Sequence, residues 1–175
     1  MDWEFPSTTE QSAALTDLLS RLRAALDEAA SKRENSKPHF VLTAALSAGD
    51  DNNRALEIPK IAQSLDYINL MNYDFSGAWS NLTANMANLH KSPGSPCSEA
   101  AGADSVFSYM HRGMPVGKIL FDMPLYGKSF ADTDGLNKPF NGTGNGSYDD
   151  PSGIWDLKAL PRPGGQVIYE PVSHS

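Results

Sequence analysis

Two acidic residues one position apart open the chain, Asp2 and Glu4. If residues 1–5 end a strand, its two-residue alternation points both carboxyl groups to the same side. Two neighbouring carboxylates disfavour simultaneous ionisation, so one of them can stay protonated near neutral pH and act as a general acid. Glycosidic bond cleavage uses this chemistry. Two solvated acids at the N-terminus of a helix have the same spacing, so the spacing alone leaves both interpretations open.

A second group of chemically useful side chains follows a predicted strand at residues 67–73. It consists of Met71, Tyr73, Asp74 and Trp79. Tyrosine and aspartate can hydrogen-bond a sugar or its acetamido group, and an indole ring offers a flat apolar face to the C–H surface of a sugar. Methionine and tyrosine also fill ordinary cores, and a loop tryptophan can cover one. Composition alone therefore does not separate sugar binding from packing.

The elements that position these side chains begin with a long amphipathic helix. Ser7 and Glu10 fit a capping box, and apolar residues then recur at three-and-four spacing. We predict that this helix ends near Ser36, because Pro38 cannot continue it. The near-continuous apolar run at 39–47 predicts a strand buried on both faces, as in parallel sheets.

Helices and strands then alternate along the chain. We predict a helix at 58–65, a strand at 67–73, a helix at 103–112 and a strand at 118–125. This alternation implies right-handed crossovers and a parallel sheet, either open or closed into a barrel. The carboxyl ends of barrel strands surround the active site, which is where the sequence puts the two groups of polar residues.

The composition changes after residue 130. Glycine, asparagine, aspartate and proline become frequent, and no long periodic segment remains. We therefore predict two domains, 1–130 and 131–175. Within the second, residues 153–157 predict a short ordered turn with Trp155 packed as a structural aromatic.

Length and charge exclude several classes of function. The chain has 175 residues, of which 40% are hydrophobic, and this is too short for a complete barrel of about 250 residues. Its 14 basic and 21 acidic residues give a net charge of −7, so nucleic acid is not an expected partner. No apolar run is long enough to span a membrane, and the first residues lack the pattern of a secretory signal.

The sequence does not indicate a metal enzyme. A single cysteine, Cys97, forms neither an internal disulfide nor a zinc cluster, and four histidines without ligand spacing stand at His39, His90, His111 and His174. We expect no metal and no cofactor.

Three triplets match the acceptor for N-glycosylation, and they begin at Asn81, Asn141 and Asn145. Such triplets arise often by chance, so they indicate secretion only weakly.

Four segments carry a resemblance to a known family. DWEFP at 2–6 resembles the end of the DxxDxDxE signature of glycoside hydrolase family 18, the chitinases, with Glu4 as its final acid and Asp2 as the aspartate two positions before. LMNYDFSGAW at 70–79 resembles the motif of the family's sixth strand.

The later segments resemble the same family. MPLYGKSF at 123–130 is similar to its seventh-strand motif, although Lys128 stands where many members have arginine. GIWDLKALP at 153–161 resembles the small α+β insertion of one chitinase subgroup, and its sequence is most similar to fungal members. The resemblance implies an α/β fold, a partial TIM (β/α)8 barrel of about strands four to seven with the beginning of the insertion domain.

The resemblance also implies a retaining, substrate-assisted mechanism. Glu4 would protonate the leaving glycosidic oxygen, and the substrate's own N-acetyl carbonyl would attack the anomeric carbon. Asp2 would orient the acetamido group, and the Tyr73 hydroxyl would hold its carbonyl oxygen. The reacting sugar would contact Met71, Asp74 and Tyr126, and Trp79 would stack on the leaving-group side.

The resemblance implies chitin or chito-oligosaccharides as the substrate and a secreted parent protein, and says nothing of oligomeric state. The chain begins inside the signature, so we expect a fragment of doubtful activity, with exposed strand edges.

A non-catalytic chitin-binding lectin is one alternative function, although such relatives typically lose the glutamate. An endo-β-N-acetylglucosaminidase is another, and it fits the later segments less well.

Overall fold

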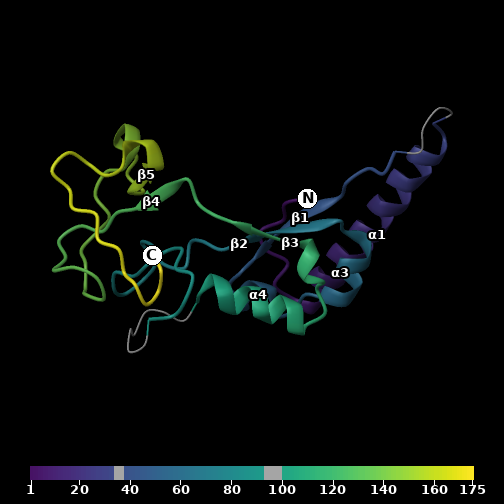
Figure 1. Cartoon of the computed structure of the whole chain (residues 1–175), viewed down its shortest axis with the longest axis horizontal. Coiled ribbons are helices and arrows are strands. Elements are labelled where there is room, and N and C mark those ends of the chain that lie inside the picture. The colour runs from purple at the N-terminus through teal and green to yellow at the C-terminus, as the bar shows by residue number, and fades with distance from the viewer. Residues whose placement is uncertain (34–37, 93–99) are drawn as a thin grey trace. The chain divides into compact units, whose positions relative to one another are not determined.

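A computed structural model describes residues 1–33, 38–92 and 100–175. The described chain forms two compact units (Figure 1). The first consists of Met1–Met71 with Ser105–Asp122, and the second of Asn72–Asp104 with Met123–Ser175. The domain boundary expected after residue 130 stays a prediction.

A three-stranded parallel sheet forms the centre of the first unit. Its strands are β1 (Thr43–Ser47), β2 (Tyr67–Met71) and β3 (Ile119–Asp122), in the order β1-β2-β3. The opening residues lie beside β1, because Asp2 forms a parallel bridge with Ala45. The predicted parallel sheet is confirmed.

Helices cover one face of this sheet (Figure 1). They are α1 (Thr9–Ser31), α3 (Ile58–Ser64) and α4 (Gly102–His111), and a short helix α2 (Asp50–Asn53) follows β1. Three short 3-10 turns complete the elements, η1 (Val116–Lys118), η2 (Ser147–Asp149) and η3 (Leu157–Ala159).

The two faces of the sheet differ in burial. Ala44, Leu46, Ile68 and Leu70 are at most 3% exposed, whereas their neighbours along β1 and β2 are mostly half-buried. The helix side forms a core, completed by Leu15, Leu19, Ile58, Ile61 and Tyr109. The prediction that 39–47 is buried on both faces is therefore wrong, because described helices cover only one face.

The N-cap of helix α1 lies one residue later than predicted. Thr8 is the N-cap: the Gln11 N–H donates to Thr8 Oγ1 at 3.2 Å, and Gln11 Oε1 accepts from the Thr8 N–H at 3.2 Å. Ser7 and Glu10 have the same spacing, so the sequence signature fits either pair. The helix ends at Ser31, before the predicted end near Ser36, which lies outside the described residues.

The other predicted helices agree with the structure to within about a residue, whereas the strands are shorter than predicted. The observed strands are 43–47, 67–71 and 119–122, in place of 39–47, 67–73 and 118–125. Pairing with a neighbouring strand, which the apolar pattern does not report, decides where each strand ends.

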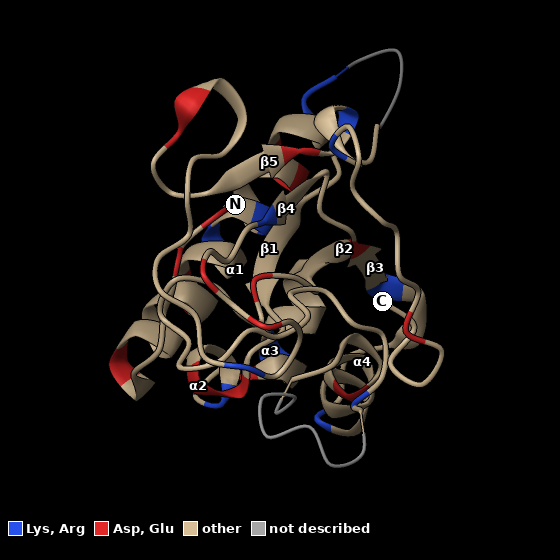
Figure 2. Ribbon diagram, turned by 90° about the vertical axis from the view of Figure 1, so that its left-hand side faces the viewer, with Lys and Arg blue, Asp and Glu red and all other residues tan. Residues whose placement is uncertain are grey.

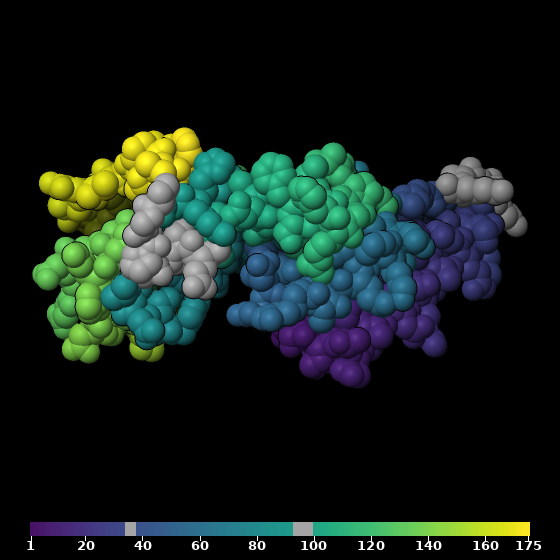
Figure 3. Space-filling model, turned by 90° about the horizontal axis from the view of Figure 1, so that it is seen from below, coloured from purple at the N-terminus to yellow at the C-terminus, as the bar shows by residue number. Residues whose placement is uncertain are grey.

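Polar contacts hold α4 against the end of β1 and the loop before α3. The Tyr109 hydroxyl donates to the Ser47 carbonyl at 2.8 Å, and burial raises the pKa of Tyr109. The Arg112 guanidinium donates to Asn53 Oδ1 at 2.7 Å and to the Leu56 carbonyl at 3.0 Å. Figure 3 shows the atoms of α4 side by side with those of the residues before β2.

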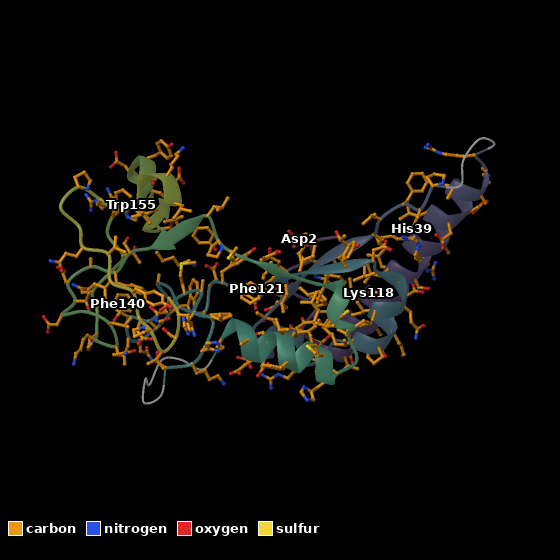
Figure 4. The ribbon with its side chains drawn as sticks, viewed as in Figure 1. Asp2, His39, Lys118, Phe121, Phe140 and Trp155 are labelled. Atoms are coloured by element: carbon orange, nitrogen blue, oxygen red, sulfur yellow. The ribbon has the colours of Figure 1, made fainter. Side chains whose placement is uncertain are left out.

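A two-stranded antiparallel ribbon anchors the second unit. Strand β4 (Tyr126–Lys128) pairs with β5 (Ile154–Asp156). The prediction of a short turn at 153–157 is wrong in part, because residues 154–156 form a strand. Their partner strand β4 lies more than twenty residues earlier in the sequence. The Arg162 guanidinium lies 4.5 Å from the ring centroid of half-buried Trp155, which Figure 4 labels.

No helix in the described part of the chain is long and apolar enough to cross a membrane. Figure 2 shows the Lys and Arg residues distributed among Asp and Glu residues. Cys97 lies outside the described residues.

Candidate active site

Asp2 lies on the sheet face that faces away from the helices (Figure 4). Its bridge partner Ala45 pairs with Asn69 of β2. Paired residues of neighbouring strands share a face, and so do residues two apart along a strand. Asp2 and Met71 therefore lie on the same face of the sheet.

Glu4 lies just beyond this bridge. It is exposed and occupies a bend, and the Glu4–Phe5 peptide bond is cis. The prediction of a strand through residues 1–5 is therefore wrong after Asp2, because the chain turns to enter α1 and the Ser7 N–H donates to the Phe5 carbonyl at 3.0 Å. Strand alternation does not place Glu4 beside Asp2.

Asp122 is a second acid on the same face as Asp2, which the sequence analysis missed. It pairs with Met71 at the carboxyl end of β3 and is half-buried. Burial raises the pKa of its carboxyl group. An acid inside the apolar run at 118–125 was the available signal, since alternation along that strand separates Asp122 from Phe121.

The second unit brings together a set of side chains around Asp74. The Tyr126 hydroxyl donates to Asp74 Oδ1 at 2.7 Å, and Lys128 Nζ lies 3.0 Å from the same oxygen. Tyr126 and Lys128 are two residues apart on β4, so they share a face of the ribbon. The Asp74 side chain remains 42% exposed, whereas that of Lys128 is only 10% exposed.

Trp79 completes this set. The residue is 63% exposed, and Lys128 Nζ lies 4.1 Å from the centroid of its ring in a cation–π contact. A Cβ at Gly77 would lie 2.6 Å from atoms of the Trp79 ring, so only glycine leaves the indole this position. The indole is thus held by Gly77 and Lys128 while much of its surface stays open.

Tyr73 lies next to this set. Its ring centroid is 6.1 Å from that of Tyr126, in an edge-to-face arrangement. The structure therefore groups the predicted residues by unit: Asp2, Glu4 and Met71 belong to the first, and Tyr73, Asp74, Trp79 and Tyr126 to the second. We call the second group, with Lys128, the Asp74 cluster.

Lys128, which stands where many family members have arginine, is the centre of the Asp74 cluster. Its ammonium group contacts both the carboxylate of Asp74 and the ring of Trp79. An open indole face, a carboxylate and phenol hydroxyls are suited to a pyranose, which has an apolar C–H face and polar hydroxyl groups. Among the residues that the structure describes, no group of three His, Cys, Asp or Glu could hold a metal ion.

The sequence profile described as glycosyl hydrolases family 18 matches residues 1–172. The chain belongs to glycoside hydrolase family 18. Endochitinase 1 of Metarhizium robertsii is 44% identical to this family 18 chain over 174 residues, covering 99% of the chain and 40% of the relative. Chitinase 1 of Aphanocladium album is 42% identical, covering 95% of the chain and 39% of the relative. The chain thus spans about 40% of the length of these relatives.

Solved structures agree with this assignment. Chitinase ChiA74 from Bacillus thuringiensis matches with a TM-score of 0.87 and 26% identity, over 99% of this chain and 32% of that one. A class V chitinase from Nicotiana tobaccum matches with a TM-score of 0.82 and 27% identity, over 98% of this chain and 51% of that one. The predicted membership of family 18 is confirmed, and so is the α/β class.

Proposed function

We propose that this family 18 chain belongs to an enzyme that hydrolyses chitin, the β-1,4-linked polymer of N-acetylglucosamine. The observation that carries the proposal is the Asp74 cluster, in which a carboxylate, two phenols and an open indole offer the chemistry that a sugar requires. The names of the chitinase relatives support the same substrate class. Chitin or a chito-oligosaccharide is the proposed partner, and no metal or cofactor takes part.

The proposed mechanism retains the anomeric configuration and uses the substrate's own acetamido group. Glu4 protonates the leaving glycosidic oxygen while the N-acetyl carbonyl attacks the anomeric carbon, which gives an oxazolinium ion. Asp2 orients the acetamido group and offsets its positive charge, and the Tyr73 hydroxyl holds the carbonyl oxygen. Glu4, now ionised, activates the water that opens the oxazolinium ring. The match of these residues to the family signature supports the assignment.

The remaining residues of the proposal bind the sugar. Met71, Asp74 and Tyr126 contact the ring that reacts, and Trp79 stacks on the leaving-group side. The hydrogen bond between Tyr126 and Asp74 supports this assignment, because it orients both groups before substrate arrives.

We also propose the finer architecture, a partial TIM (β/α)8 barrel of about strands four to seven followed by the beginning of an α+β insertion in 131–175. The parallel sheet with helices on one face supports it. Secretion of the parent protein is proposed as well, and the exposure of Asn81, Asn141 and Asn145 supports it by leaving the acceptor asparagine of each glycosylation triplet accessible.

The test uses the parent protein that carries this chain and compares it with its Glu4→Gln variant. It measures turnover of a chromogenic chito-oligosaccharide and, separately, binding of the same ligand. We expect Glu4→Gln to lose most turnover and to keep binding, because the amide preserves shape and removes the proton donor. The control is Glu28→Gln, which changes an exposed acid paired with Lys32 on α1.

Three other outcomes would contradict parts of the proposal. Unchanged turnover in Glu4→Gln would falsify the acid assignment. Binding without turnover by the unchanged parent protein would favour the chitin-binding lectin. A parent protein that neither cleaves nor binds would overturn the proposed substrate.

A further inference from the structure

Two Asn–Gly pairs lie four residues apart in the segment between β4 and β5. They are Asn141–Gly142 and Asn145–Gly146, and both asparagines are exposed. An asparagine followed by glycine can lose its side-chain amide spontaneously, because glycine has no Cβ to shield its backbone nitrogen or to restrict the chain. The two pairs are identical in sequence, so a difference in reactivity between them comes from the folded structure.

The reaction needs a free backbone N–H on the glycine. The glycine nitrogen attacks Cγ of the asparagine: the N–Cγ bond forms, the Cγ–Nδ2 bond breaks, and ammonia leaves with the proton of the glycine N–H. Water then adds to one of the two carbonyls of the cyclic imide and opens it to aspartate or isoaspartate. A glycine N–H that donates to a carbonyl is held back from this attack, because its hydrogen bond must break first.

The N–H of Gly146 is held in this way. It donates to the Asp150 carbonyl at 2.7 Å. A Cβ at Gly146 would lie 2.0 Å from the carbonyl oxygen of Ile154, so the backbone packs directly against β5. The following residue is fixed as well, because Ser147 Oγ accepts from the Asp156 N–H at 2.9 Å. The nitrogen of Gly146 is therefore bonded and has little room to move.

The N–H of Gly142 has a different environment. It donates to no acceptor among the residues that the structure describes. Gly142 is exposed, and a Cβ added to it would meet no atom within 4 Å. The hydrogen bonds of this pair use its outer groups: the Asn141 N–H donates to the Ala131 carbonyl, and the Gly142 carbonyl accepts from the Ala131 N–H, both at 2.9 Å. The attacking nitrogen is left free.

We propose that Asn141 is a site of spontaneous deamidation in the folded protein, and that the fold protects Asn145 from the same reaction. The co-reactant is water, and the product is an aspartate or isoaspartate that carries one more negative charge. The inference is independent of the proposed function, because it rests on the backbone contacts of Gly142 and Gly146 alone.

The isoaspartate product also changes the local structure. It adds one methylene group to the main chain between the Asn141 N–H and the Gly142 carbonyl, the two groups that bond to Ala131. These groups then no longer match the spacing of their partners. The neighbouring contact between the rings of Phe130 and Phe140, whose centroids lie 4.7 Å apart, loses its support (Figure 4 labels Phe140).

The test incubates the purified parent protein that carries this chain in mildly alkaline buffer, because base favours attack by the glycine nitrogen. The protein is produced in bacteria, so that neither asparagine carries a glycan. Peptide mapping by mass spectrometry follows each site, and enzymatic methylation identifies isoaspartate. We expect Asn141 to convert about tenfold faster than Asn145, the ratio that one hydrogen bond of ordinary strength produces. Hydrogen exchange of the peptide that contains Ala131 should be faster in the converted protein.

The matched control is the same incubation in denaturant. Unfolding frees both N–H groups, so the two asparagines should convert at nearly equal rates. Asn141→Gln should abolish conversion at position 141 and leave that of Asn145 unchanged, because glutamine must close a larger ring.

Three outcomes overturn the inference. They are equal conversion of Asn141 and Asn145 in the folded protein, no conversion of Asn141 in the folded protein, and a difference between the sites that persists in denaturant. Unchanged exchange around Ala131 after conversion would overturn the structural consequence. None of these outcomes bears on chitin hydrolysis, which is tested separately.

Discussion

The ammonium group of Lys128 lies 3.0 Å from Oδ1 of Asp74. With its side chain only 10% exposed, Lys128 needs a charged or polarisable partner, and it has two, because its Nζ also lies 4.1 Å from the Trp79 ring centroid. The carboxylate and the indole are thus positioned through a single cation.

Lys128→Gln should weaken chito-oligosaccharide binding about tenfold, since it removes both the charge-assisted bond to Asp74 and the cation–π contact with Trp79. Calorimetric titration of the variant against the unchanged chain measures the effect. Lys138→Gln, at an exposed lysine of the same unit, is the control and should bind normally. Equal Kd values for both variants would show that Lys128 does not organise the site.

Lys118→Met should destabilise the first unit by about 1–3 kcal/mol. Lys118 Nζ donates to the Ala62 carbonyl at 2.8 Å and the Leu65 carbonyl at 2.6 Å, so it satisfies the C-terminal end of α3. Urea unfolding measures the loss. The control Lys60→Met breaks an exposed ion pair with Glu57 and should cost at most about 1 kcal/mol. Similar losses in the two variants would contradict the capping role.

Asp66→Asn should destabilise the chain at neutral pH and lose this effect in acid. Burial acts to raise the pKa of Asp66, but bonds from the Leu42 N–H and from His39 lower it on balance. A lowered pKa in the folded state contributes stability above the usual value near 3.8, and that contribution disappears as pH falls through the folded pKa. Urea unfolding across this pH range checks the trend.

The control for that series is Asp17→Asn, which removes an exposed ion pair with Arg21. It should be nearly neutral at every pH. A constant difference between Asp66→Asn and the unchanged chain, independent of pH, would mean that the charge of Asp66 is not what stabilises the fold.

Asp122→Asn should have the opposite pH dependence. Burial raises the pKa of Asp122, so its charge costs stability once pH rises above the usual value near 3.8. The variant should be more stable than the unchanged chain at neutral pH and equally stable in acid. Thermal unfolding at the two pH values measures this difference, and a variant that is less stable at neutral pH would contradict it.

Local patterns were sufficient to predict which elements exist in the first unit. The three-and-four spacing of apolar residues predicted α1, and the apolar runs predicted β1, β2 and β3 in parallel. The same patterns did not predict where the strands end, or that residues 154–156 form a strand. Those features depend on which distant segment pairs with the strand, as Tyr126 does with Asp156.

The amino-acid types along the chain determined by themselves that Tyr73, Asp74 and Trp79 are chemically suited to a sugar, because that suitability is a property of the side chains. Only the tertiary structure decided that Lys128 joins Asp74 to Trp79, and that Asp122 shares a sheet face with Met71. The physical reason is that contacts and burial arise between residues about fifty positions apart, and sequence spacing carries no information about such distances.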